Sequence, residues 1–204
     1  MNMKHTHESG RSMIEMLGVL AIIGVLSVGG IQGYSMAMSK FKVSKTTDQV
    51  QTMVTNIRTL FAGNRTYNGL SNTNAYTMGI FNDEICDDKT CANPVNPYGG
   101  KIILGTPNSN QYFSITYAKL PTDACTRLAM ADWGDASSGL VAITLSGTEA
   151  TAAPTAWAHV AAAQGTGTFT TATVGDIPVS LSNAVLACKP ATGDNTSSIT
   201  WIYR

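Results

Sequence analysis

The sequence has few charged residues and few histidines, and these shortages exclude several classes of function. Only 13% of the 204 residues are charged, and 13 basic residues balance 13 acidic ones, so the formal net charge is zero. This balance argues against nucleic-acid binding through a strongly basic face, although it leaves room for a local basic patch. The hydrophobic content of 44% excludes disorder of the whole chain.

Motifs that carry enzyme chemistry are also missing. The three histidines are His5, His7 and His159, and no Gly-x-Ser-x-Gly string presents a nucleophilic serine. No Gly-Lys-Ser/Thr string offers a phosphate-binding loop. A zinc site at the Cys-x₄-Cys pair Cys86 and Cys91 is disfavoured because no histidine lies near it. The sequence therefore predicts no enzyme, no cofactor and no metal.

Only one segment is long and apolar enough to cross a bilayer, which excludes a polytopic membrane protein. Residues 16–39 contain no charged side chain, and residues 13–31 would form a helix about 28 Å long. Glu15 lies in the first turn of this segment, and an ionised carboxylate costs at least about 2.5–3.5 kcal/mol near the bilayer centre. An ordinary signal anchor or cleavable secretory signal is the alternative, with a weak cleavage site near residues 27–30. The length of the run and Glu15 count against it.

The residues at the start of this segment resemble a known signal. The string Gly10-Arg11-Ser12-Met13-Ile14-Glu15, followed by the apolar run, resembles the class III signal of type IV pilins and pseudopilins. The resemblance implies that a prepilin peptidase cuts after Gly10, that Arg11 becomes the N-terminus, and that Glu15 is the fifth mature residue. It also implies that Glu15 pairs with the freed amine of a neighbouring copy. The family usually has an N-methylated apolar residue at the first mature position, and Arg11 departs from this pattern.

The helical pattern continues beyond the apolar run, and we predict one helix over residues 14–61, about 72 Å long. One face of its second half repeats at steps of three and four, through Val43, Thr47, Val50, Val54, Ile57 and Phe61. Gly63 is predicted to end the helix, and no proline occurs before Pro94. We expect a leader at 1–10, a transmembrane or filament-core helix at 11–39, an amphipathic helix at 40–62 and a globular head at 63–204.

The head is predicted to be α+β, with the long helix against a mostly antiparallel sheet. Strands are expected at residues 101–104, 112–117, 140–145 and 169–174, and a closing strand contains Ile199, Trp201 and Tyr203. Residues 121–130 should form a short helix capped by Thr122, and residues 154–164 a second helix. Residues 105–110 are predicted to form a turn. Trp133, Trp157 and Trp201 are expected to be buried or half-buried anchors of the head.

Parts of the head resemble the type IVb subgroup, which includes toxin-coregulated pilins and conjugative thin-pilus subunits. The matching pieces are residues 56–60, 67–70, 96–100 and 125–128 and the late Cys188. Four cysteines allow three pairings. The resemblance implies a Cys125–Cys188 bond, which leaves Cys86–Cys91 as a local disulfide, with Asp87 and Asp88 between them in a solvated turn.

The resemblance implies a structural subunit of a type IVb-like pilus filament (fimbrium), serving adhesion, aggregation or conjugation. Its partners would be other copies of itself through the N-terminal helices, a prepilin peptidase, an inner-membrane platform protein and an assembly ATPase. It would reside in the bacterial inner membrane and then in the extracellular pilus. Two alternatives remain open: a pseudopilin of type II secretion, and a membrane-anchored periplasmic enzyme or binding domain that is not cleaved after Gly10.

Overall fold

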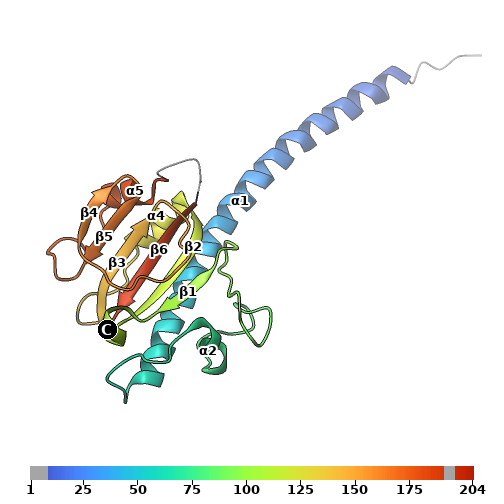
Figure 1. Cartoon of the computed structure of the whole chain (residues 1–204). Coiled ribbons are helices and arrows are strands. Elements are labelled where there is room, and N and C mark those ends of the chain that lie inside the picture. The colour runs from blue at the N-terminus through green and yellow to red at the C-terminus, as the bar shows by residue number, and fades with distance from the viewer. Residues whose placement is uncertain (1–8, 191–195) are drawn as a thin grey trace, which may run out of the picture. The chain divides into compact units, whose positions relative to one another are not determined.

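The computed structural model describes residues 9–190 and 196–204, with side chains described from residue 13 onward (Figure 1). The chain divides into two compact units, Met1–Phe41 and Lys42–Arg204. Helix α1 (Ser9–Phe61) contributes to both units, and it ends two residues before Gly63. The long helix is therefore confirmed.

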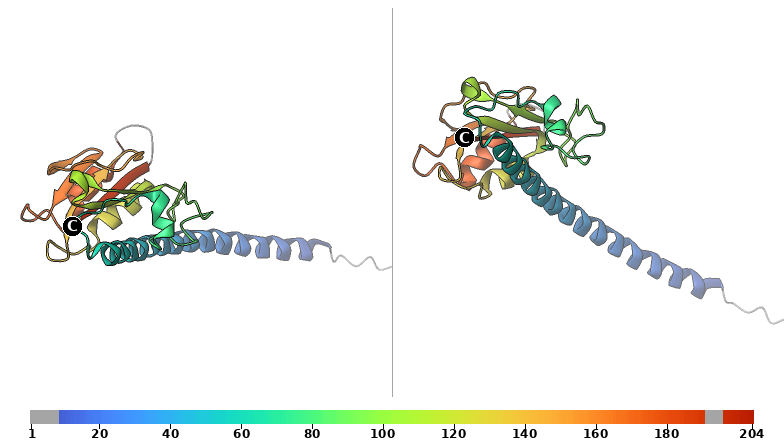
Figure 2. Two further views of the ribbon diagram at one scale, coloured as in Figure 1. Left: turned by 60° about the horizontal axis from the view of Figure 1, so that its bottom comes forward. Right: turned by 90° about the horizontal axis from the view of Figure 1, so that it is seen from below.

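The second half of α1 belongs to the core of the second unit. Its predicted apolar face is buried at Val50, Val54, Ile57 and Phe61, and these side chains share one cluster with residues of the sheet. Figure 2 shows this part of α1, in teal, running along the sheet. Removing an amphipathic face from water in this way is what stabilises such a helix.

The sheet is antiparallel throughout and has the strand order β1-β2-β6-β3-β5-β4. The strands are β1 (Ile102–Gly105), β2 (Phe113–Pro121), β3 (Leu140–Ser146), β4 (Val160–Ala163), β5 (Thr166–Thr170) and β6 (Thr196–Tyr203). In β6, Trp201 is opposite Ile115 on one side and Ile143 on the other. The predicted antiparallel head with a closing C-terminal strand is confirmed.

Alternate residues of β6 have different surroundings, because side chains of a strand point to opposite faces of a sheet. Ile199, Trp201 and Tyr203 lie in the hydrophobic core. On the other face, Thr200 exchanges a hydrogen bond with Thr116 at 2.8 Å, and the Ser198 hydroxyl donates to the carbonyl of Thr148 at 2.7 Å. Short hydroxyl side chains therefore join β6 to its neighbours on the side away from the core.

One predicted element of the head is wrong, and another has different bounds. Residues 154–164 form no helix: the segment before residue 160 is irregular, and β4 makes a hairpin with β5 through a turn at Gly165, whose φ is +74°. Pairing with β5 overrides the helical preference of its alanines. The strand expected at residues 169–174 ends at Thr170, whose N–H donates to the Asp176 carboxylate at 3.1 Å.

The helices of the head are short. Helix α4 (Thr122–Met130) is present as predicted, but Thr122 does not cap it, since Pro121 occupies the N-cap position without a side-chain bond. Helices α2 (Asn72–Thr77) and α5 (Leu181–Cys188) were not predicted, although Ser71 and Ser180 provide serine N-caps. Helix α3 (Pro107–Asn110) occupies the expected turn.

Candidate functional site

The apolar half of α1 has its large side chains in contact with solvent. Over residues 13–31 they are 52–75% exposed: Met13, Ile14, Met16, Leu17, Val19, Leu20, Ile22, Ile23, Val25, Leu26, Val28 and Ile31. By length and composition alone, the helix Met13–Phe61 contains a stretch that could cross a membrane. Burying one such side chain is worth about 1.5–3 kcal/mol, so this surface requires either lipid or other protein around it.

Glu15 is an exposed acid in this apolar surface. Neither ion pair found among the described residues involves it. Gly10 and Arg11 lie within the helical backbone of α1, but their side-chain surroundings are outside the described part of the chain, as is the structure of residues 1–8. The cleavage after Gly10 and the pairing of Glu15 with a freed amine therefore stay predictions.

Five glycines interrupt the side-chain surface of the same half of the helix. A Cβ placed on Gly18, Gly24, Gly29, Gly30 or Gly33 would meet no atom within 4 Å. The backbone is accessible at these positions, and small residues allow another helix to approach closely.

The Cys125–Cys188 disulfide is present, as the resemblance implies. It joins α4 to the last residue of α5, with a Cα–Cα distance of 5.9 Å, and both cysteines are fully buried. The bond encloses β3, β4 and β5, so it ties the two helices that flank this part of the head.

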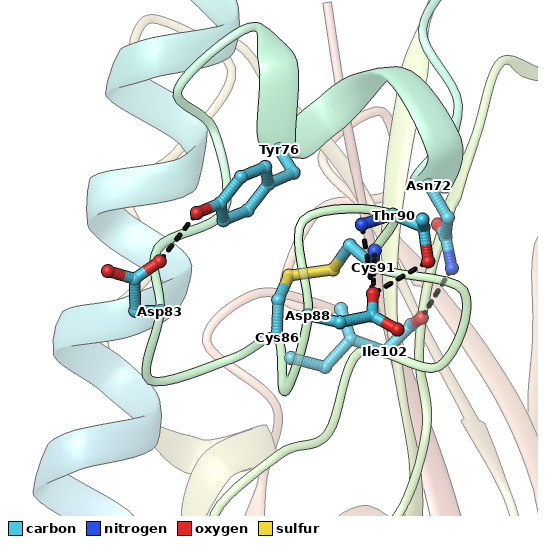
Figure 3. The surroundings of a disulfide bond; sticks show 8 residues. All are labelled: Asn72, Tyr76, Asp83, Cys86, Asp88, Thr90, Cys91 and Ile102. Carbon is cyan, nitrogen blue, oxygen red and sulfur yellow. Dashed lines mark hydrogen bonds between the residues drawn. A yellow bond between two sulfur atoms is a disulfide. The ribbon is translucent and has the colours of Figure 1, made fainter.

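The second disulfide, Cys86–Cys91, closes a loop whose geometry is set by Asp88 (Figure 3). The Asp88 carboxylate accepts the Thr90 hydroxyl at 2.6 Å, the Thr90 N–H at 2.9 Å and the Cys91 N–H at 2.8 Å. These bonds, the Thr90 hydroxyl first, lower the pKa of Asp88. One oxygen of the Asp88 carboxylate therefore accepts all three hydrogen bonds from within its own turn. Among the described residues, no cluster of three or more His, Cys, Asp or Glu side chains could hold a metal ion.

The region around this loop is fastened to α1 by polar contacts. The Lys45 ammonium forms an ion pair with the Glu84 carboxylate, which lowers the pKa of Glu84. The Asn56 amide donates to the carbonyl of Gly79 at 3.2 Å. These contacts position residues 79–91 on the polar flank of the helix.

The tryptophans are buried or half-buried, and His159 lies at the surface of the head. Trp201 and Trp133 are buried with ring centroids 4.6 Å apart, and half-buried Trp157 contacts Tyr112 edge-on at 4.6 Å. His159 is exposed, precedes β4 and lies 3.2 Å from Asp176. The expectation of anchoring tryptophans is confirmed, whereas the helix expected around His159 is absent.

A long N-terminal helix, an antiparallel sheet beside its second half and a disulfide near the C-terminus define the fold of a type IV pilin, and comparison with solved structures agrees. The crystal structure of TcpA, a type IV pilin from Vibrio cholerae El Tor biotype, matches with a TM-score of 0.53 and 18% sequence identity. The match covers 80% of this chain and 99% of that one, and it shows the shared fold.

Sequence comparison identifies the family. The family model described as PilS N terminal matches residues 40–202, so this chain belongs to the PilS family. The major structural subunit of bundle-forming pilus from Escherichia coli O127:H6 is 29% identical over 139 residues, which are 67% of this chain and 72% of that protein. The corresponding subunit of Escherichia coli O111:H- has the same identity and coverage. The chain therefore combines the type IV pilin fold with membership of the PilS family.

Proposed function

We propose that this chain is a structural subunit that polymerises into a type IVb-like pilus filament. The observation that carries the proposal is the exposed apolar surface of residues 13–31 on a chain whose remaining residues have a pilin fold. The relatives named as major structural subunits of a pilus support a structural and not an enzymatic role. They also favour a pilin over a pseudopilin of type II secretion.

Maturation removes residues 1–10. A prepilin peptidase cuts between Gly10 and Arg11 on the cytoplasmic side, and the apolar helix stays on the mature protein. Before assembly, residues 11–39 cross the inner membrane and residues 63–204 lie outside it. After assembly, the same helix forms the core of an extracellular filament. A platform protein and an ATPase of the assembly machinery move the subunit between these two states.

The physical problem of assembly is selectivity. Lipid tails and neighbouring helices are equally apolar, so transfer of α1 from membrane to filament gains little from hydrophobicity alone. Close approach at Gly29 and Gly33 provides packing, and the pairing of Glu15 with the freed amine of a neighbour provides a polar contact at one height along the helix. Such a pair sets register more than it adds stability.

The test has two parts. N-terminal sequencing of the membrane form should begin at Arg11, and an intact Met1 or a cut near Gly30 would contradict the proposal. Glu15→Ala should give a processed, membrane-held protein without filaments in electron microscopy of sheared surface material. Glu149→Ala removes an exposed acid of the head and should assemble normally. Normal filaments from Glu15→Ala would exclude the assigned role of Glu15.

A further inference from the structure

Residues 67–70 form a tight turn between α1 and α2 whose two ends are fixed. The Leu70 N–H donates to the carbonyl of Tyr67 at 3.2 Å, and Gly69 has a φ of +89°. A hydrogen bond between the first and fourth residues with a positive φ at the third matches a type II turn, which favours glycine there. Leu70 is buried, and the Tyr67 ring centroid lies 4.8 Å from that of Phe113. The core therefore anchors both ends of the turn.

The two central residues of the turn, Asn68 and Gly69, are exposed. Among the described residues, none donates to or accepts from the Asn68 amide or the Gly69 N–H. A Cβ at Gly69 would meet no atom within 4 Å apart from its chain neighbours. Asn74 Nδ2 donates to the Gly69 carbonyl at 2.8 Å, which holds the peptide group that follows Gly69. The peptide group between Asn68 and Gly69 is not held.

Asn68 and Gly69 form the one Asn-Gly dipeptide of the sequence. In this dipeptide the backbone nitrogen of the glycine can attack the side-chain amide before it, because no Cβ hinders the approach. The attack requires rotation about ψ of the asparagine and φ of the next residue, and glycine adopts positive and negative φ about equally well. The central peptide group can therefore turn over while Tyr67 and Leu70 stay in place.

We propose that Asn68 is a site of spontaneous deamidation, with the Gly69 nitrogen as the nucleophile. This nitrogen bonds to Asn68 Cγ and loses its proton to solvent, and the side-chain nitrogen takes up a proton and leaves as ammonia. The product is a five-membered succinimide, which water opens. Attack of water at Cγ gives aspartate, and attack at the backbone carbonyl carbon gives isoaspartate. In total, one water enters and one ammonia leaves.

The two products differ in their effect on the turn. Both add one negative charge to a chain whose formal net charge is zero. In isoaspartate the backbone also passes through Cβ and Cγ, so it has one more atom between the anchored Tyr67 and Leu70. Hydrogen bonds weaken when donor and acceptor are poorly aligned. Isoaspartate should therefore weaken the bond that closes the turn, whereas aspartate should leave it intact.

Three asparagines close to Asn68 provide internal controls. Asn72, Asn74 and Asn82 lie with it in the tryptic peptide of residues 66–89, and each precedes a residue that has a side chain. The amides of Asn72 and Asn74 are also engaged in hydrogen bonds to backbone carbonyls. All four asparagines are therefore measured in one peptide under the same conditions.

The first experiment uses the full-length chain in detergent micelles. The protein is incubated at neutral and at mildly alkaline pH in water enriched in a heavy oxygen isotope, then reduced and digested in ordinary water. Mass spectrometry follows the exchange of NH₂ for labelled OH, and isoaspartyl methyltransferase marks isoaspartate. We expect Asn68 to convert at least tenfold faster than each control asparagine, faster at alkaline pH, and with isoaspartate among the products. Equal rates at the four positions, or no isoaspartate, overturn the proposal.

The same incubation in denaturant tests whether the fold leaves the site open. The folded chain should convert Asn68 within about tenfold of the rate of the denatured chain. A slower folded rate would show that the structure protects Asn68, against the proposal.

Variants identify the nucleophile and the effect on the turn. Gly69→Ala should slow conversion of Asn68 at least tenfold, and Gly63→Ala, at another exposed glycine, should not change it. A wild-type rate in Gly69→Ala excludes the Gly69 nitrogen as the nucleophile. Asn68→Asp should unfold at the same denaturant concentration as fresh wild type, whereas aged wild type that contains isoaspartate should unfold at a lower one. Equal midpoints for fresh and aged protein contradict the weakened turn.

Discussion

The side chain of Asn72 pairs with the backbone of Leu104 as a neighbouring strand would. Asn72 Oδ1 accepts the Leu104 N–H at 2.8 Å, and Asn72 Nδ2 donates to the carbonyl of Ile102, also at 2.8 Å. Both backbone groups face away from β2, on the outer edge of the sheet. On the same edge, the Ile102 N–H donates to the Pro94 carbonyl at 2.9 Å. The side-chain amide at the start of α2 therefore helps to close this edge of the sheet against pairing with another strand.

Replacing Asn72 with alanine should lower the free energy of unfolding by about 1–3 kcal/mol, because it leaves a donor and an acceptor at a half-buried edge without partners. Chemical denaturation measures the change. Asn68→Ala alters an exposed asparagine nearby and should stay within about 0.5 kcal/mol of the wild type. Equal stabilities of the two variants would show that water replaces the Asn72 bonds without loss.

The two disulfides should differ in their contribution to stability. The loop-entropy model gives about 4 kcal/mol for Cys125–Cys188, which spans 63 positions, and about 2 kcal/mol for Cys86–Cys91, which spans 5. The paired double alanine variants should therefore unfold at clearly different denaturant concentrations. All four cysteines are buried, so removal of either disulfide also leaves gaps in the core, which add to both losses of stability. A larger loss of unfolding free energy on removal of Cys86–Cys91 than on removal of Cys125–Cys188 would contradict this prediction.

The ion pair between Lys45 and Glu84 should make stability depend on pH in the acid range. The Lys45 ammonium lowers the pKa of Glu84 below its ordinary value of 4.5, so the folded chain binds the proton less readily than the unfolded chain. The contribution of this ion pair to the free energy of unfolding is present above pH 4.5, and it is lost as the pH falls through the lowered pKa of Glu84. Because both side chains are substantially exposed, it should be less than about 1 kcal/mol.

The measurement is the unfolding free energy at a series of pH values from 7 to 3. Glu84→Gln should flatten the acid limb of this profile slightly, and Lys45→Gln should do the same. Asp87→Asn changes an exposed carboxylate in the same region and serves as the control. If the unfolding free energy falls equally with acid in the wild type and in Glu84→Gln, titration of Glu84 does not contribute to the pH dependence of stability.

Gly139 should tolerate substitution poorly. Its φ is +78°, a left-handed conformation that costs an L-residue about 1–2 kcal/mol, and an added methyl group would displace the Arg58 guanidinium. Gly139→Ala is therefore expected to lower the free energy of unfolding by at least about 1 kcal/mol. Gly63→Ala, where a Cβ meets open space, should be close to neutral. Calorimetry of both variants checks the difference.

The elements that could be predicted from the sequence are those with a long or regular pattern. The apolar run and the repeat from Val43 to Phe61 predicted α1, and the alternation at Ile199, Trp201 and Tyr203 predicted β6. In each case the local pattern and the tertiary packing favour the same structure.

Other features depend on contacts between distant parts of the chain. Residues 160–163 are alanine-rich and gave no strand signal, because their conformation is set by pairing with β5. The contact between the Arg58 guanidinium and the main-chain oxygen of Arg204 was not predicted, because the two residues are 146 positions apart in the sequence. The serine caps Ser71 and Ser180 are signals that could have identified α2 and α5.

The central place of β6 constrains how this protein is made. The strand that separates β2 from β3 consists of residues 196–203, so it leaves the ribosome after all other strands. Until then, β2 and β3 each lack the neighbour that β6 provides. The six-stranded sheet therefore cannot close before residues 196–203 have been synthesised, because β2 and β3 are joined only through β6.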